Sequence, residues 1–248
     1  MGRVRVLNGN FDRVGIVEAV DAVVAMIRTG RRGYVATVNV AVLMMMRSDP
    51  RLQAFVDRAA LVVADGQPLV FASRWSSSSL PGRVAGVDLL EALLTRAEKE
   101  RLRVYLLGAR SEVISAAAAR IRERWPALTL CGAADGYFSP AEAAERAREV
   151  ARSEAHILLV GMGVPRQEYF LETQWDELGA AVAIGVGGAL DVLAGVRPRA
   201  PKVIQTLGLE WLFRLAQEPR RLWRRYLVTN SQFVYLLLKE VLRVPERP

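Results

Sequence analysis

Short apolar runs alternate along the chain with segments in which apolar residues recur every three or four positions. The runs have the length of buried strands, and the clearest are LVVA (61–64), VYLLG (104–108), ILLVG (157–161) and VAIG (182–185). The periodic segments, such as VDLLEALLTRAEKE (87–100), are typical of amphipathic helices. Because strands and helices take turns, the pattern predicts an α/β fold: a Rossmann-like, mostly parallel sheet with helices on both faces.

The pattern changes after residue 195. The segment VRPRAPKVIQTLG (196–208) is rich in proline and arginine and predicts a linker. The segment 209–244 predicts two helices that are interrupted near Pro219. We therefore expect two parts, a Rossmann-like core over residues 1–195 and a helical appendage over residues 196–248.

Charge separates the same two parts. The chain carries a net charge of +8, and residues 196–248 hold eleven Lys or Arg and four Asp or Glu, which is +7 of that total. At about 100° per residue, helix geometry sets Arg220, Arg221, Arg224 and Arg225 on one arc and Leu222, Trp223, Tyr226 and Leu227 on the opposite arc. A basic, aromatic amphipathic helix of this kind suits an anionic membrane surface. The alternative is a helix that docks on the core and keeps its basic face in water.

Composition removes several classes of protein. One cysteine, Cys131, excludes an internal disulfide and a cysteine-based metal cluster, and the single histidine, His156, opens an apolar run where a structural role is expected. The sequence contains no GxxxxGK[ST] loop and no Asp-x-Asp pair, and GMGVPR lacks the third glycine of a dinucleotide fingerprint. We therefore expect no metal and no cofactor. Without an apolar leader or a run of 18 apolar residues, we expect a cytoplasmic protein.

The stretch LVVADGQP (61–68) sets a carboxylate, Asp65, where an apolar strand ends. One interpretation is a helix cap, because Gln67 and Pro68 open the next helix and an aspartate accepts its free N–H groups. The other interpretation is a functional carboxylate, because ligands of open α/β sheets bind beyond the carboxyl ends of the strands. The stretch alone leaves both open.

Polar residues follow other predicted strands. Thr37 and Asn39 share one side of a strand end, although Asn39 is equally suited to cap the next helix. Gln167 lies in a first helical turn, whose free N–H groups suit a phosphate or sugar hydroxyls. The remaining candidates are Gly187 with Asp191, for a phosphate and a ribose or base, and Gly136 with Tyr137, for stacking on a base. Turns between strands and helices commonly hold such residues, so each is weak by itself.

A series of motifs in fixed order gives these residues a common context. They are TVN (37–39), ADGQP (64–68), GR (82–83), GVDL (86–89), GVPRQE (163–168), GVGGALDVLAG (185–195), RAP (199–201) and LEWLFRLAQEPRRLWRR (209–225). In this order they resemble the WecG/TagA/CpsF glycosyltransferases, glycosyltransferase family 26. The resemblance extends over nearly the whole chain. One departure is Gly82, where many relatives carry an acid before the arginine.

The resemblance implies an inverting, metal-independent bacterial glycosyltransferase. Such an enzyme moves a sugar of the N-acetylmannosamine or glucose type from a UDP-sugar to a polyprenyl-pyrophosphate-linked saccharide at the inner face of the cytoplasmic membrane. The products serve teichoic acids, enterobacterial common antigen, capsules or exopolysaccharides. The resemblance also implies a basic appendage that docks on the membrane and closes the site, and it admits a homo-oligomer.

The resemblance assigns roles to individual residues. It implies that Asp65 is the catalytic base, and that Thr37, Asn39, Arg83 and Gln167 line the sugar pocket. Three arginines of the appendage are candidates to neutralise the departing pyrophosphate: Arg214, Arg221 and Arg224.

The residues by themselves are also compatible with two other functions. One is a nucleotide-dependent oxidoreductase, which a parallel sheet alone would suggest but which needs a complete glycine fingerprint. The other is a non-enzymatic protein whose basic tail binds a membrane or a nucleic acid, which leaves the polar strand ends unexplained. We expect no nucleic-acid partner.

Overall fold

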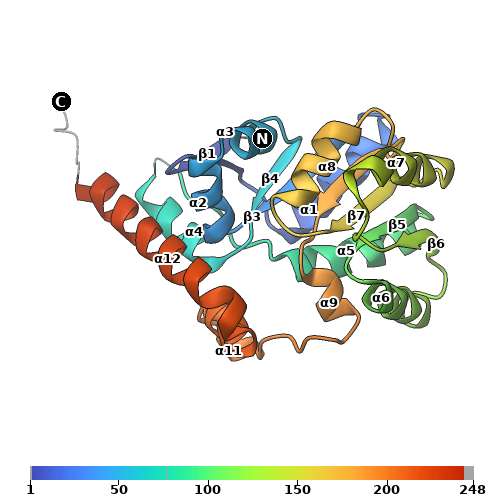
Figure 1. Cartoon of the computed structure of the whole chain (residues 1–248). Helices are drawn as coiled ribbons and strands as arrows, with labels where there is room; N and C mark the ends of the chain where they lie inside the picture. Colours follow the sequence, from blue (N-terminus) through green and yellow to red (C-terminus); the bar gives the residue numbers. More distant parts are fainter. Residues whose placement is uncertain (1, 77, 243–248) are drawn as a thin grey trace.

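The core of the protein is a six-stranded, all-parallel sheet (Figure 1). The computed structural model describes residues 2–76 and 78–242, apart from the side chains of Thr206 and Arg221. The strands of the sheet are β3 (Gly33–Val38), β4 (Leu61–Ala64), β5 (Arg103–Gly108), β6 (Thr129–Ala134), β7 (Ile157–Gly161) and β8 (Val182–Gly185). Their spatial order is β4-β3-β8-β7-β5-β6. The α/β fold predicted from the sequence is therefore confirmed.

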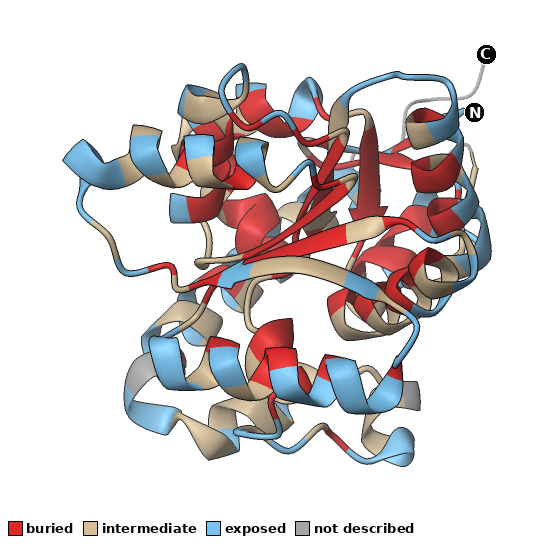
Figure 2. Ribbon diagram, turned by 90° about the vertical axis from the view of Figure 1, so that its right-hand side faces the viewer, coloured by how far each residue is buried: buried red, intermediate tan, exposed pale blue. Residues whose placement is uncertain are grey.

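Helices cover both faces of the sheet, as the alternating pattern requires. One layer consists of α1 (Ile16–Arg28), α5 (Gly86–Lys99), α6 (Ser111–Arg124) and α9 (Ala189–Leu193). The other consists of α2 (Val40–Ser48), α3 (Pro50–Asp57), α4 (Gln67–Ala72), α7 (Ala143–Arg152) and α8 (Arg166–Gln174), with single 3₁₀ turns at Ser73–Trp75 and Pro140–Glu142. Side chains of a strand alternate between the two layers, so Leu61 and Val63 join one core and Val62 and Ala64 the other. Figure 2 shows the buried strands between the two helical layers.

The N-terminal segment differs from the parallel pattern. Strands β1 (Arg3–Val6) and β2 (Gly9–Asp12) form a separate antiparallel hairpin, which turns at Leu7 and Asn8. The carboxylate of Asp12 is buried and accepts a hydrogen bond from the backbone N–H of Val62 at 2.8 Å. The hairpin thus covers β4, an edge strand whose N–H groups would otherwise lack partners.

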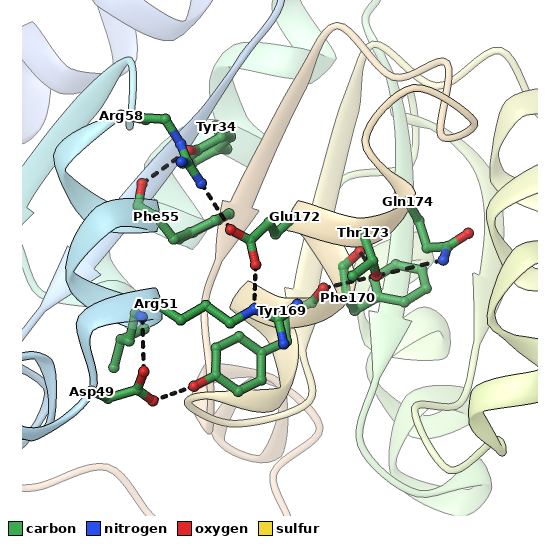
Figure 3. Close-up of polar contacts among 11 residues, drawn as sticks. Tyr34, Asp49, Arg51, Phe55, Arg58, Tyr169, Phe170, Glu172, Thr173 and Gln174 are labelled. Atoms are coloured by element: carbon green, nitrogen blue, oxygen red, sulfur yellow. Dashed lines mark hydrogen bonds and ion pairs between the residues drawn. The ribbon is translucent and has the colours of Figure 1, made fainter.

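A polar cluster fastens α8 to α3 (Figure 3). Glu172 accepts hydrogen bonds from Arg51 Nε at 2.5 Å and from Arg58 Nη2 at 2.8 Å. The hydroxyl of Tyr169 donates to Asp49, and the Arg51 guanidinium lies 4.2 Å from the centre of the Tyr169 ring. The cluster fixes the rotation of α8 about its axis, and therefore the direction of the side chains in its first turn.

Three helices follow the core: α10 (Lys202–Thr206), α11 (Glu210–Gln217) and α12 (Pro219–Leu242). The break at Pro219 agrees with the sequence prediction, whereas the predicted linker contains the short helix α10. Helix α12 packs along α2 (Figure 1) and buries Leu222 and Phe233. Among the described residues, no helix combines the length and the apolar character needed to cross a membrane.

The predicted basic and apolar arcs of α12 do not coincide with its outer and inner sides. Arg224 and Leu227 are both exposed on the outer side, whereas Arg225 and Tyr226 both turn toward the core and line a cavity there. The reason is that α12 packs on α2 and buries Phe233 in the core there, which sets its rotation independently of the charge pattern.

Candidate functional site

A cavity of about 410 Å³ lies between the sheet and the C-terminal helices. Its floor is formed by the segments that follow β3, β4, β7 and β8, and its roof by α11 and α12. These four strands are neighbours in the sheet, so the turns at their carboxyl ends meet at one place. Among the described side chains, the charged residues in the wall are five arginines and three acids: Arg83, Arg197, Arg199, Arg214, Arg225, Asp65, Glu210 and Glu218.

Asp65 lies on the cavity floor, where its backbone N–H continues the sheet by donating to Val38 O at 2.8 Å. The N-cap of α4 is Gly66 and not Asp65, and the backbone N–H that acts on the Asp65 carboxylate is that of Gly86 at the start of α5. Burial raises the pKa of the Asp65 carboxyl above its ordinary value, and the negative charge of Glu210 acts in the same direction. Arg214, Arg83 and the N–H of Gly86 oppose this rise without cancelling it.

Thr37 and Asn39 flank Asp65 from β3. The hydroxyl of Thr37 donates to Gly185 O at 2.7 Å, and Asn39 Oδ1 accepts from Val42 N at 3.1 Å as the N-cap of α2. Both residues also line the cavity. For Asn39 the capping role and the place in the cavity wall therefore coexist.

Gln167 enters the cavity wall from the first turn of α8. It is 2 % exposed, its Nε2 donates to Glu168 Oε1 at 2.8 Å, and its Oε1 is buried without a hydrogen-bond partner among the described residues. A methyl group at Gly185 would lie 2.5 Å from Gln167 Nε2, so β8 must end in glycine for the amide to fit. An acceptor beside the cavity with its bonding capacity unused is suited to a hydroxyl donor of a ligand.

Glu168 belongs to the GVPRQE motif, but no role was predicted for it from the sequence. It is 8 % exposed, and burial raises the pKa of its carboxyl to about 7, while Gln167 and Arg225 act to lower it. Its Oε2 is buried without a hydrogen-bond partner among the described residues. A carboxyl in this environment holds its proton near neutral pH.

We expect Glu168→Gln to make the protein more stable at alkaline pH than the wild type. The raised pKa means that the folded state binds the Glu168 proton more tightly than the unfolded state. Wild-type stability must therefore fall as pH rises from the unfolded pKa to about 7, by up to about 3 kcal/mol. Urea unfolding at pH 5 and pH 8 measures this, with the exposed Glu177→Gln as control. Equal stability changes at the two pH values would contradict it.

Arg83 and Arg214 reach the cavity from opposite sides. Arg83, in the loop before α5, donates from Nη1 to Glu210 and from Nη2 to Gln205 Oε1 at 3.1 Å. Arg214, from α11, lies over the turn after β8: its Nη2 would be 3.1 Å from a methyl group placed on Gly188. The neighbouring Gly187 has a φ of +49° and also lines the cavity. Guanidinium groups and a glycine turn together suit a phosphate.

Four further candidates from the sequence do not line the cavity. Asp191 lies behind the wall, with Oδ2 3.9 Å from Arg197 Nη1. Gly136 and Tyr137 follow β6 at the far edge of the sheet, where the Tyr137 ring is 67 % exposed beside the Arg166 guanidinium. Arg224 points outward from α12. The side chain of Arg221, also a candidate, lies outside the described residues.

The cavity also contains residues that the sequence reasoning missed. Glu210 and Glu218 bring carboxylates from the appendage, and Glu218 pairs with Arg197 through two contacts of 3.0 Å. Arg199 donates to Asp88 at the start of α5 and to Gln205 Oε1 at 3.2 Å. Glu210 and Arg214 are four residues apart, a spacing that sets them on one face of a helix, and this signal was available in the sequence.

The cavity therefore combines a carboxylate of raised proton affinity with guanidinium groups that suit an anion. Within residues 2–76 and 78–242, no three His, Cys, Asp or Glu side chains gather as they would to hold a metal ion. Compared with models of protein families, residues 4–247 match the one described as the glycosyl transferase WecG/TagA/CpsF family. The match extends over essentially the whole chain, and it favours a transferase over the oxidoreductase that the sequence left open.

Proposed function

Because the chain belongs to the WecG/TagA/CpsF family of glycosyltransferases, which serve cell-surface polysaccharide synthesis, we propose that it transfers a sugar from a UDP-sugar to a polyprenyl-pyrophosphate-linked saccharide with inversion. The observation that carries this proposal is the position of Asp65. It is the one carboxylate that the core contributes to the described cavity wall, and it faces the guanidinium groups of Arg83 and Arg214.

In the proposed reaction, an acceptor hydroxyl attacks the anomeric carbon of the donor and gives its proton to Asp65. The new carbon–oxygen bond forms on the face opposite the bond to the leaving UDP, so the anomeric configuration inverts. The raised pKa of Asp65 suits this role, because a base of higher pKa accepts a proton more readily. Such a base contributes about 10²- to 10⁴-fold to the rate.

The leaving UDP develops negative charge on its pyrophosphate, and we assign its neutralisation to the arginines of the cavity. Arg214 lies at the turn after β8, and Arg197, Arg199 and Arg225 complete the positive wall. Fixed positive groups in a water-poor cavity stabilise developing charge more than they would in water. Thr37, Asn39 and Gln167 supply the polar contacts for sugar hydroxyls. In this proposal, helices α10 to α12 act as a lid over the core. The boundary between the core and the appendage therefore stays near residue 195.

The outer side of the same lid is suited to a membrane. Large apolar side chains are exposed along one side of α12: Trp223, Leu227, Tyr235, Leu238 and Leu242. Arg220, Arg224 and Lys239 are exposed on the same helix. Apolar side chains that enter a lipid surface beside cations that attract anionic headgroups give reversible peripheral binding. We therefore propose that the protein works at the inner face of the cell membrane, where its acceptor is anchored.

We expect Leu227→Ser and Leu238→Ser each to weaken binding to anionic vesicles by about tenfold, because burial of one leucine contributes roughly 1.5 kcal/mol or more. Cosedimentation with phosphatidylglycerol vesicles measures the partition. The matched control is Val17→Ser, an equally exposed apolar position on α1 of the core. Binding that is the same in all three variants as in the wild type would contradict the assignment of this face.

The test of the function is the release of UDP from a panel of donors in the presence of EDTA. The donors are UDP-linked N-acetylmannosamine, N-acetylmannosaminuronic acid, glucose and glucuronic acid, and the acceptor is polyprenyl-pyrophosphoryl-N-acetylglucosamine or -glucose. We expect one donor to give acceptor-dependent release that persists in EDTA. Release that requires a divalent cation would refute the metal-independent mechanism.

A further inference from the structure

Glu210 is the unexpected acid of this site, because it brings a second carboxylate next to the proposed base. It lies in the first turn of α11, lines the cavity and accepts a hydrogen bond from Arg83 Nη1. If Asp65 is the base, as proposed above, we further propose that Glu210 is a positioning residue, which holds the Arg83 guanidinium away from Asp65 and so keeps that carboxylate free to accept a proton.

The geometry supports a holding role. Arg83 is bound on both sides of its guanidinium, by Glu210 at Nη1 and by Gln205 Oε1 at 3.1 Å from Nη2. Both partners belong to the C-terminal helical segment, so Arg83 points at the lid. Its side chain is 17 % exposed, and a guanidinium so far removed from water requires a nearby anion.

Without Glu210, two other acids are candidate partners for Arg83. Asp88 Oδ2 is 3.9 Å from Arg83 Nη2, but Asp88 already accepts a hydrogen bond from Arg199. Asp65 lines the same cavity as Arg83, and the positive charge of Arg83 acts on it. An Arg83–Asp65 ion pair would satisfy both groups and would occupy the oxygen atoms that must take the acceptor proton.

The charged groups that act on Asp65 come from two elements. Helix α11 supplies Glu210 and Arg214, and the segment leading into α5 supplies Arg83 together with the N–H of Gly86. Glu210 raises the pKa of Asp65, whereas the other three lower it. Burial is the largest influence that raises the pKa of Asp65, and Glu210 adds to it. Removing the Glu210 charge takes away this addition and releases Arg83, so both consequences lower the pKa of Asp65. The rest of the charged wall consists of Arg197, Arg199, Glu218 and Arg225.

The control is Glu218. It also belongs to the C-terminal segment, lines the cavity and holds an arginine, but that arginine is Arg197 of the same segment and not Arg83 of the core. Glu218→Gln therefore removes a carboxylate and an ion pair from the cavity wall without releasing Arg83. A merely structural role of Glu210 predicts the same result for both variants.

The experiment follows the ¹³Cγ shifts of aspartate carboxyls in the labelled full-length protein as pH changes. The resonance of Asp65 is identified by its loss in Asp65→Asn. We expect Glu210→Gln to lower the Asp65 midpoint by about one pH unit, Glu210→Asp to give an intermediate value, and Glu218→Gln to leave it as in the wild type. In an Arg83→Gln background, Glu210→Gln should shift the midpoint less, because Arg83 is no longer there to be released.

An unchanged midpoint in Glu210→Gln, an equal shift in Glu218→Gln, or an undiminished shift without Arg83 would each overturn the proposal. Circular dichroism shows whether each variant folds. If Glu210→Gln does not fold, the test rests on the midpoint measured in Glu210→Asp, which keeps the charge. The titration needs no substrate. A midpoint that moves as expected in a protein without transferase activity would therefore refute the proposed function alone. With the correct donor, Glu210→Gln should lower kcat about tenfold at neutral pH with KM within about twofold.

Discussion

Asp65→Asn should abolish most of the transferase activity and at the same time make the protein more stable. The loss of turnover is expected to be about 10²- to 10⁴-fold, since asparagine cannot accept the proton of the acceptor hydroxyl. The gain in stability is expected because burial disfavours the ionised carboxylate in the folded state, on the order of 1 kcal/mol or about 2–4 °C in Tm. UDP release and thermal unfolding measure the two effects on the same samples.

The pH dependence of this stability gain gives an independent check. The folded pKa of Asp65 is above the unfolded value, so the wild type loses stability as pH rises from the unfolded pKa through the folded one. The difference in Tm between Asp65→Asn and the wild type should therefore increase as pH rises above about 4. The exposed Asp176→Asn serves as the control for both measurements. An Asp65→Asn protein as active as the wild type would remove Asp65 from the mechanism.

Arg214→Ala should lower kcat by about 10²- to 10³-fold, the usual cost of losing one fixed group that stabilises developing charge. The physical reason is its position over the turn after β8, where the pyrophosphate of the leaving UDP is expected. Arg214→Lys should recover part of the rate, because lysine keeps the charge but lacks the planar fork of donors. Steady-state kinetics with the active donor and acceptor measure both variants.

The control for Arg214 is Arg122→Ala, an arginine exposed on α6 outside the cavity. Arg214→Ala also removes a positive charge that lowers the pKa of Asp65, so its pH–rate profile should shift to higher pH. A variant that raises KM for the donor and leaves kcat unchanged would assign Arg214 to ground-state binding. In that case the charge of the leaving group would have to be met by Arg197 and Arg199.

Both predictions apply to the conformation in which helices α10 to α12 lie over the core. Glu210, Arg214 and Glu218 belong to the appendage, whereas Asp65, Arg83 and the polar strand ends belong to the core. The ion pair Glu210–Arg83 joins the two parts across the cavity, whereas Glu218–Arg197 lies within the appendage and lines the same cavity. A donor that brings its own pyrophosphate competes with these carboxylates for the arginines, so we expect donor binding and lid position to be coupled.

The sequence by itself determined the layered fold and the common location of much of the site. Apolar runs indicate buried strands, and apolar residues that recur every three or four positions indicate helices. The carboxyl ends of neighbouring parallel strands lie at one edge of the sheet. Asp65, Thr37, Asn39, Gln167 and Gly187 therefore meet in the cavity as expected. The N-terminal hairpin escaped this reasoning because a short apolar run does not reveal whether its neighbour is parallel or antiparallel.

Only the tertiary structure decided which charges face the site. A helical pattern gives the relative angles of Arg224 and Arg225, but the packing of α12 on α2 decides that Arg225 turns inward. The environment of Glu168 and the pairing of Glu210 with Arg83 likewise depend on residues far away in the sequence. Charge–charge interactions and desolvation depend on distance and burial in three dimensions, and a local pattern contains neither.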